Sequence, residues 1–274
     1  MRIARFATAG KDAAHGTIEL ASDGGDNPDS IAVLDGDPFA GGAVHAAGER
    51  HRLHDVRLLA PVIPRSKIVG VGRNFADHAA EMGHEVPVGA PLLFFKPNTS
   101  IVGLGEPIIV PAGVEHLHFE GELAIVIGRR CKDVPADQVS EVIFGYTIAN
   151  DVTQRDWQSS DGQWARAKGS DTFCPLGPFI ATDLTIVEAS RLSIRTRVNG
   201  DLRQDGNTSQ MVRGISELVS FISSFTTLLP GDLILTGTPK GVGNIGDGDV
   251  VEIEIDGLGT LSNPVLASTR GPSS

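Results

Sequence analysis

Three carboxylates in the middle of the chain have a spacing that suits metal binding. Glu120 and Glu122 are two residues apart in a strand-like segment, so we expect their side chains on one face. Two carboxylates on one face repel each other unless a cation or a proton lies between them. Asp151 directly follows the strand-like run 142–150 and would stand at its end. Together the three acids predict an oxygen-only site for Mg²⁺, Mn²⁺ or Ca²⁺, with coordination positions left open.

Two other interpretations of the acids stay open on spacing alone. The acids would form a solvated strand edge if no ion binds them, with Asp151 as a turn residue. His116 and His118 precede the first acid and offer an alternative zinc site. The sequence assigns no basic partner to the three acids.

A second group of residues suits acid–base chemistry. His78 and Glu81 are three apart in the segment 74–82, which begins with Asn74, a residue able to cap a helix, and is followed by Gly83. On a helix this spacing makes the two side chains neighbours. A carboxylate beside an imidazole fixes the tautomer and raises the basicity of the ring, as a general base requires. The alternative is an ordinary surface contact.

The elements that must position these groups are mostly strands. Segments rich in Val and Ile and bounded by Gly or Pro predict strands, over residues 1–8, 17–20, 31–34, 67–71, 92–96, 122–127, 142–149, 192–198, 232–236 and 250–255. Helical periodicity is limited to 74–82 and 216–229. We therefore predict a β-rich α+β fold rather than a regular alternation of strands and helices. The prolines at 61–64 suggest a linker, which divides the chain into a small N-terminal domain, 1–65, and a larger domain, 66–274, that carries the three acids and the His–Glu pair.

Composition narrows the classes of function. The 274 residues include 23 Lys and Arg against 34 Asp and Glu, a net charge of −11. An acidic chain repels phosphates and anionic lipids, so we expect neither a nucleic-acid nor a membrane partner. The N-terminus lacks the apolar core of a secretory signal. With two separate cysteines, Cys131 and Cys174, expected as free thiols, these features predict a cytoplasmic protein.

Two glycine-rich stretches do not complete a nucleotide-binding motif. Residues 70–75 lack the third glycine of a dinucleotide fingerprint, because Phe75 stands in its place. Residues 237–243 contain a lysine but not the Gly-Lys-Ser/Thr step of a phosphate-binding loop. The chain also has no G-x-S-x-G elbow, so no serine nucleophile is evident.

Six ordered motifs resemble those of the fumarylacetoacetate hydrolase family. They are KIVGVGRNFADHAAEMG (67–83), PLLFFKP (91–97), HFEGELAIVIG (118–128), ANDVTQRDWQ (149–158), WARAKGSDTFCPLGP (164–178) and LILTGTPKGVG (233–243). The resemblance spans roughly 67–265 and implies that family's mixed β-sandwich or roll, often dimeric, with Mg²⁺ or Mn²⁺. It implies the following roles: Glu120, Glu122 and Asp151 as metal ligands, His78 with Glu81 as a catalytic pair, Lys168 as an active-site lysine, and Arg73 and Thr238 as substrate contacts.

The resemblance also implies a substrate class. We expect a small 2-oxo acid or its enol, and hydrolysis of a C–C bond in an acylpyruvate- or fumarylpyruvate-type compound, as in the catabolism of aromatic compounds. The alternatives are an isomerase acting on 2-hydroxyhepta-2,4-diene-1,7-dioate and an oxaloacetate decarboxylase or tautomerase. A non-catalytic binding protein on the same fold is a more distant alternative. Residues 75–91 surround the His–Glu pair with glycines and prolines, and we expect them to close over bound substrate as a lid.

Overall fold

The computed structural model describes residues 1–20 and 29–269 and consists mainly of mixed β-sheets. Residues 21–28, which include most of a stretch at 23–30 whose Gly, Asp, Asn and Pro predict turns, and the last five residues lie outside this description. The largest sheet has the order β4-β3-β2-β1-β14-β12-β11-β17-β6-β7, with β5 paired to β1 and β8 to β14. Its strands are β1 (Arg2–Ala7), β2 (Ala14–Glu19), β3 (Ser30–Leu34), β4 (Ala46–Arg52), β5 (Arg57–Leu59), β6 (Ile68–Gly72), β7 (Leu92–Lys96), β8 (Ile101–Val102), β11 (Gly121–Ile127), β12 (Ile143–Asn150), β14 (Cys174–Ala181) and β17 (Leu233–Leu235).

Two smaller sheets complete the β-structure of the described chain. The first has the order β16-β15-β19-β20-β9 and packs on β11, β12 and β14. Its strands are β9 (Ile108–Val110), β15 (Ser193–Val198), β16 (Asp201–Asn207), β19 (Val250–Ile255) and β20 (Gly259–Ala267). The second joins β10 (Leu117–Phe119), β13 (Thr153–Gln154) and β18 (Gly243–Asn244). This arrangement confirms the predicted β-rich α+β fold.

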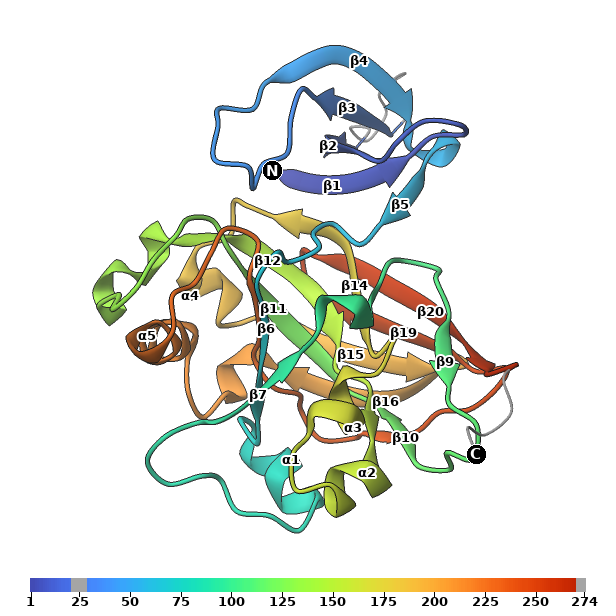
Figure 1. Ribbon diagram of the computed structural model, residues 1–274, viewed down its shortest axis with the longest axis vertical. Helices are drawn as coiled ribbons and strands as arrows, with labels where there is room; N and C mark the ends of the chain where they lie inside the picture. Colours follow the sequence, from blue (N-terminus) through green and yellow to red (C-terminus); the bar gives the residue numbers. More distant parts are fainter. Residues whose placement is uncertain (21–28, 270–274) are drawn as a thin grey trace.

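Helices are short and lie at the margins of the sheets. They are α1 (Ala76–Glu81), α2 (Arg155–Ser160), α3 (Ala165–Gly169), α4 (Ile186–Ala189) and α5 (Ile215–Phe225), with 3₁₀ turns at Leu53–Asp55, Asn98–Ser100, Ala136–Glu141 and Thr208–Gln210. In Figure 1, α1, α2 and α3 lie together at the end of the molecule opposite β1–β4. None of the helices within the described ranges is long and apolar enough to cross a membrane.

The core explains why the central strands read as apolar runs. All residues of β11 and β14 are buried, and β12 is buried from Gly145 onward, because both faces of these strands are covered.

The predicted helix 216–229 is shorter than expected: α5 ends at Phe225, Thr226 is extended at φ −136°, and Leu228 forms a bridge with Cys131. Cys131 and Cys174 are free thiols.

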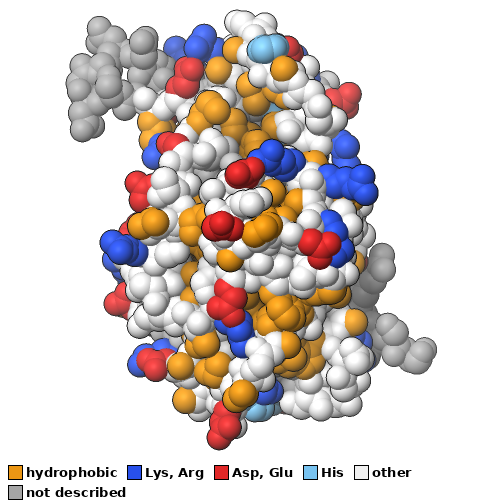
Figure 2. All heavy atoms as spheres, turned by 90° about the vertical axis from the view of Figure 1, so that its left-hand side faces the viewer, with side chains coloured by type: hydrophobic (Ala, Val, Ile, Leu, Met, Phe, Trp, Pro, Cys, Tyr) orange, Lys and Arg blue, Asp and Glu red, His pale blue; other side chains and the backbone are white. Residues whose placement is uncertain are grey.

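The N-terminal strands are hydrogen-bonded to the rest of the molecule. Arg2 and Ile3 in β1 pair with Ala181 and Ile180 in β14, so the large sheet continues from one region into the other. In Figure 1 strands β1–β4 stand above the remaining chain, which they meet through β1, β5 and β14. Figure 2 shows one face of the molecule, on which acidic and basic side chains are interspersed and hydrophobic side chains gather in the lower half.

Candidate metal centre and active site

The candidate site forms where four strands of the large sheet end beside one another. Antiparallel pairing of Gly121 with Asn150 places the start of β11 next to the end of β12. The backbone N–H of Asp151 consequently donates to the carbonyl of Glu120 at 2.9 Å. On the other side of β11, β17 ends next to Glu122 and runs parallel to β6. Residues far apart in the sequence therefore meet at one edge of the sheet.

The three predicted acids converge at this edge and are buried. Glu120, Glu122 and Asp151 each offer one carboxylate oxygen, and these oxygens lie within 4.8 Å of one another. Glu120 occupies the break between β10 and β11 rather than a continuous strand, and its backbone N–H donates to the side chain of Asn150 at 2.9 Å. Asp151 directly follows β12, as the sequence predicts.

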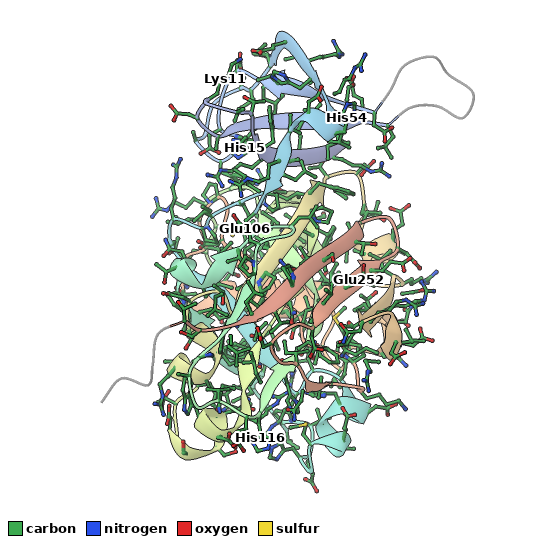
Figure 3. The ribbon with its side chains drawn as sticks, turned by 90° about the vertical axis from the view of Figure 1, so that its right-hand side faces the viewer. Lys11, His15, His54, Glu106, His116 and Glu252 are labelled. Atoms are coloured by element: carbon green, nitrogen blue, oxygen red, sulfur yellow. The ribbon has the colours of Figure 1, made fainter. Side chains whose placement is uncertain are left out.

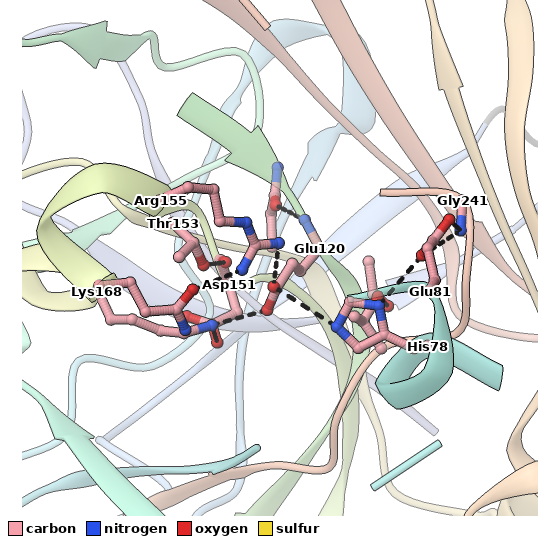
Figure 4. A network of polar contacts seen from close by, with 12 residues as sticks. His78, Glu81, Glu120, Asp151, Thr153, Arg155, Lys168 and Gly241 are labelled. Carbon is pink, nitrogen blue, oxygen red and sulfur yellow. Dashed lines mark hydrogen bonds and ion pairs between the residues drawn. The ribbon is translucent and has the colours of Figure 1, made fainter. Parts of the chain in front are cut away.

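The expectation that these acids have no basic partner is wrong. Lys168 Nζ lies 2.7 Å from Glu120 Oε2 and 2.5 Å from Asp151 Oδ2 (Figure 4). Arg155 Nη2 donates to Glu120 Oε1 at 2.6 Å, and Lys96 Nζ forms an ion pair with Asp151 Oδ1. These cations come from α3, α2 and β7, whose relation to the acids is set only by the tertiary fold.

The charges around Glu120 and Glu122 shift the pKa values of these two buried glutamates in opposite directions. Burial alone would favour the neutral acid, but Lys168 and Arg155 hold the pKa of Glu120 below its ordinary value. Burial, together with the charges of Asp151 and Glu120, raises the pKa of Glu122 well above its ordinary value. Burial opposes the charge of Lys168, but Asp151 and Glu120 outweigh it and raise the pKa of the ammonium. Glu122 is thus the acid whose charge lacks compensation.

The predicted His–Glu pair faces this acid cluster. His78 Nδ1 lies 3.3 Å from Glu81 Oε2, and its Nε2 lies 4.0 Å from Glu120 Oε1 (Figure 4). Both residues belong to α1, where the spacing of three places them on one surface. Glu81 is held in turn by the backbone N–H of Gly241. The imidazole is therefore oriented on one nitrogen and directed toward the acids with the other.

Contrary to the prediction, Asn74 does not cap α1. The helix begins after Phe75, without a side-chain cap, because the Asn74 amide donates instead to the carbonyls of Thr236 and Arg213 and accepts from the N–H of Arg213. These bonds fix the end of β6 against the end of β17. The C-terminal glycine behaves as expected: Gly83 has φ +70°, and the N–H groups of Gly83 and His84 close the last turn.

A pocket of about 490 Å³ opens over Glu120, Glu122 and His78, whereas Asp151 and Glu81 lie behind its lining. Its lining includes the remaining predicted residues, Arg73, Lys168 and Thr238. It also includes residues that the sequence did not single out, namely His84, Arg155, Gln158, Ser159 and Trp164. Arg73 has φ +57°, and its buried Nε has no hydrogen-bond partner in the described structure. The pocket therefore combines an acidic floor with cationic groups around it.

The two glycine-rich stretches have structural roles at this site. A Cβ at Gly70 would meet Phe94 at 2.1 Å, and one at Gly72 would meet Trp164 at 2.9 Å; these two rings lie 4.8 and 5.9 Å from Lys168 Nζ. In the second stretch, Gly237 N–H donates to Glu122 at 2.7 Å. In the same stretch, the N–H of Gly241 donates to the carboxylate of Glu81. Both stretches thus let aromatic rings and backbone donors approach the charged groups closely.

Lys96, Arg155 and the glycine N–H donors are the contributors that sequence reasoning missed. Arg155 lies four residues after Asp151, a spacing that would have justified testing it as a partner of the acids. Lys96 is the last residue of β7, and it reaches Asp151 because the chain continues through β8 to pair with β14 and so curls the sheet. Backbone donors leave no signal in the sequence beyond the glycines themselves.

The alternative zinc site receives no support from the geometry. His116 is exposed and pairs with Asp156 at 3.0 Å, and Figure 3 shows it at one end of the molecule. His118 is partly buried, and burial with the charge of Arg155 lowers its pKa to about 4. Within residues 1–20 and 29–269, the one group of His, Cys, Asp and Glu side chains close enough to hold an ion is the three acids.

The donor set fits a hard divalent cation. All three ligands would be carboxylate oxygens, which suit Mg²⁺ and Mn²⁺ better than Zn²⁺. In the described chain Glu122 forms no ion pair and receives one hydrogen bond, from Gly237. A cation between the acids would supply the missing compensation. A buried carboxylate cluster with an oriented imidazole at a pocket could combine metal binding with proton transfer.

Comparison with known proteins places this centre in a family. Residues 67–266 match the model of the fumarylacetoacetate (FAA) hydrolase C-terminal domain, and residues 1–61 match the Rv2993c-like N-terminal domain. Protein Rv2993c of Mycobacterium tuberculosis is 59% identical over 80% of this chain and 82% of its own length. The mitochondrial oxaloacetate tautomerase fahd2 of Xenopus laevis is 44% identical over 77% of this chain and 69% of its own.

Solved structures agree with this assignment. The 2-hydroxyhepta-2,4-diene-1,7-dioate isomerase of Mycobacterium marinum is 48% identical, with a TM-score of 0.87 over 98% of this chain and 100% of that one. The maleylpyruvate hydrolase of Sphingobium sp. SYK-6, solved with Mn²⁺ and pyruvate, is 30% identical, with a TM-score of 0.79 over the same shares. The chain belongs to the fumarylacetoacetate hydrolase family, whose members named here include an isomerase, a hydrolase and a tautomerase.

Proposed function

We propose that this protein hydrolyses a C–C bond in a small acylpyruvate- or fumarylpyruvate-type 2-oxo acid, with Mg²⁺ or Mn²⁺ held by Glu120, Glu122 and Asp151. One observation carries the proposal: His78 is oriented by Glu81 and directed at the acid cluster from the side of the pocket. A base in this position can take a proton from a water molecule beside a substrate that occupies the pocket. The Mn²⁺ and pyruvate in the maleylpyruvate hydrolase structure support the same choice of ion and substrate class.

The charged residues divide between binding the substrate and supporting the acids. When bound, the divalent ion would act as a Lewis acid that favours an enolate product. Lys168 and Arg155 line the pocket and would attract the carboxylate and 2-oxo oxygen of the substrate. Lys96 is absent from the pocket lining and forms its ion pair with Asp151. Arg73, with its unpartnered Nε, would contact the more distant end of the substrate.

Hydrolysis then requires His78 to take up one proton and to return it. The Nε2 atom accepts a proton from water, and the oxygen adds to the distal carbonyl carbon of the substrate. The bond between that carbon and C3 of the pyruvate unit breaks, and its electron pair forms the pyruvate enolate. The proton returns from His78 to C3, which yields pyruvate and a second carboxylic acid. Glu81 stabilises the imidazolium in the interval.

A tautomerase or isomerase is the second candidate, favoured by the names of two similar proteins. In that reaction His78 would move a proton between carbon and oxygen of the substrate without adding water. The carbon skeleton would stay intact. The two candidates therefore differ in whether water occupies the space beside His78.

A parallel assay distinguishes them. Acetylpyruvate, fumarylpyruvate, oxaloacetate and 2-hydroxyhepta-2,4-diene-1,7-dioate are each incubated with the protein and Mg²⁺ or Mn²⁺, and products are followed by proton NMR. We expect pyruvate and acetate from acetylpyruvate, no turnover with EDTA, and its return on adding either ion. A His116→Asn variant, which alters an exposed histidine away from the pocket, should behave like the wild type. Turnover confined to the dienedioate or to oxaloacetate tautomers would replace the hydrolase assignment with the second candidate.

A further inference from the structure

Gln204 lies behind the candidate site and touches two of its parts. It belongs to β16 and is fully buried. Its Oε1 accepts from the N–H of Gly121 at 3.0 Å and from Thr196 Oγ1 at 2.8 Å. Its Nε2 donates to Thr238 Oγ1 at 2.8 Å and to the carbonyl of Pro239 at 2.7 Å. All four hydrogen-bonding positions of the amide are therefore used.

These bonds fix the direction of every proton in the network. The N–H of Gly121 can only donate, so the amide oxygen of Gln204 must face it and the amide nitrogen must face Thr238. Thr238 consequently accepts from Gln204, and its own hydroxyl donates to the carbonyl of Gly121 at 2.9 Å. A hydroxyl has one proton and two lone pairs, so a single lone pair of Thr238 remains. Since Thr238 lines the pocket, it offers an acceptor there.

We infer that Gln204 is a positioning residue that holds Gly121, and with it the two flanking glutamates, at a fixed distance from Thr238 and keeps the Thr238 hydroxyl an acceptor toward the pocket. The inference rests on the proposed function, because the glutamates are the proposed metal ligands. Gly121 separates Glu120 from Glu122, and Gly237, which donates to Glu122, directly precedes Thr238. One amide thus spans both segments that shape the metal site.

The packing around Gly121 leaves no room for a side chain at this junction. A Cβ at Gly121 would lie 2.5 Å from Thr196 Oγ1 and 3.2 Å from Gln204 Oε1. The glycine is needed so that the amide of Gln204 can reach the backbone. The acceptor at Thr238 also selects among substrate groups, because it favours an enol or hydroxyl proton over a carboxylate oxygen at that point of the pocket.

The test compares Gln204→Met, which keeps the length of the side chain but forms none of the four bonds, with Gln204→Glu, which keeps the two acceptor contacts and loses both donor contacts. Thr196→Val is the matched control: it removes one bond to the same amide oxygen on the side away from the pocket. Mn²⁺ affinity of metal-free protein is measured by titration calorimetry, alongside Tm, kcat and KM. Calorimetry reads metal binding independently of turnover.

We expect Gln204→Met to fold and to bind Mn²⁺ about 10- to 100-fold more weakly, the usual effect of losing a group that orients metal ligands. Gln204→Glu should raise KM, since it cannot donate to Thr238. Thr196→Val should lower Tm and keep Mn²⁺ affinity within about twofold of wild type. If both Gln204 variants bind Mn²⁺ like wild type, or neither folds, Gln204 serves the fold alone and the inference is overturned. If wild type itself binds no Mn²⁺, the proposed function fails first.

Discussion

Glu81 and Gly241 join two distant parts of the candidate site through one backbone donor. The N–H of Gly241 lies 3.0 and 3.1 Å from the two carboxylate oxygens of Glu81, one of which also faces His78. Gly241 has φ +99°, and a Cβ there would lie 2.1 Å from the carbonyl of Arg203. The turn that carries Gly241 therefore requires glycine, and it holds the carboxylate that orients the proposed base.

Loss of the Glu81 charge should reduce turnover without removing the metal. We expect Glu81→Gln to lower kcat about 10- to 100-fold, as is usual when a carboxylate that orients a histidine is replaced. The affinity for Mn²⁺ should stay near that of wild type, because Glu81 is not one of the three converging acids. Glu85→Gln, at an exposed position beyond the same helix, is the control. A kcat equal to wild type in Glu81→Gln would remove Glu81 from the mechanism.

Two of the proposed metal ligands should differ in their effect on the stability of the metal-free protein. Asp151→Asn leaves Lys96 and Lys168 with less compensation in a buried site, and we expect it to lower the free energy of unfolding by about 3–5 kcal/mol. Glu122→Gln removes an acid with no ion pair in the described chain and should leave that free energy unchanged or higher. Both variants should lose Mn²⁺ binding and turnover. Urea unfolding and calorimetry measure these effects, and equal destabilisation by the two substitutions would contradict the charge assignment.

The sequence predicted much of this site because its acids and its dyad follow local spacing. Val and Ile patterning located β11 and β12, and the end of β12 placed Asp151. Lys96 was missed because it meets Asp151 only after the sheet curls from β7 to β14. Asn74 was assigned to a helix cap since local rules favour it there, but a tertiary partner at Thr236 takes its amide instead. Long-range pairing of this kind has no signature in one sequence.

Gly70 should be essential for stability and turnover, because the ring of Phe94 occupies the space that a side chain at Gly70 would need. A methyl group there would meet the Phe94 ring at 2.1 Å, and that ring lies 4.8 Å from Lys168 Nζ. We expect Gly70→Ala to cost about 1–3 kcal/mol through overpacking and to lower kcat/KM by displacing the ring. Gly246→Ala has open space around its Cβ position and should be close to neutral in both measurements. Equal behaviour of the two variants would show that Phe94 can move freely.

His15 should make stability depend on pH. Burial, assisted by Arg5 and opposed by Asp37 and the Pro61 backbone, lowers its pKa from 6.5, and Figure 3 shows it among the N-terminal strands. Between that lowered pKa and 6.5 the unfolded chain binds more protons than the folded one. The contribution of His15 to the free energy of unfolding is therefore complete above pH 6.5 and is lost as the pH falls toward the lowered pKa. Urea unfolding at pH 8 and pH 5 should show a smaller loss for His15→Gln than for wild type. An identical loss would contradict the depressed pKa.

Oxygen-18 incorporation tests the proposed hydrolysis most directly. Acetylpyruvate is incubated with the Mg²⁺-loaded protein in H₂¹⁸O, and the acetate formed is examined by mass spectrometry after a short reaction. The proposal predicts one ¹⁸O atom from water in the carboxylate of the acetate, formed at a rate that falls about 10²–10⁴-fold in His78→Ala. Recovery of acetylpyruvate with its carbon skeleton intact, and no labelled acetate, would contradict it.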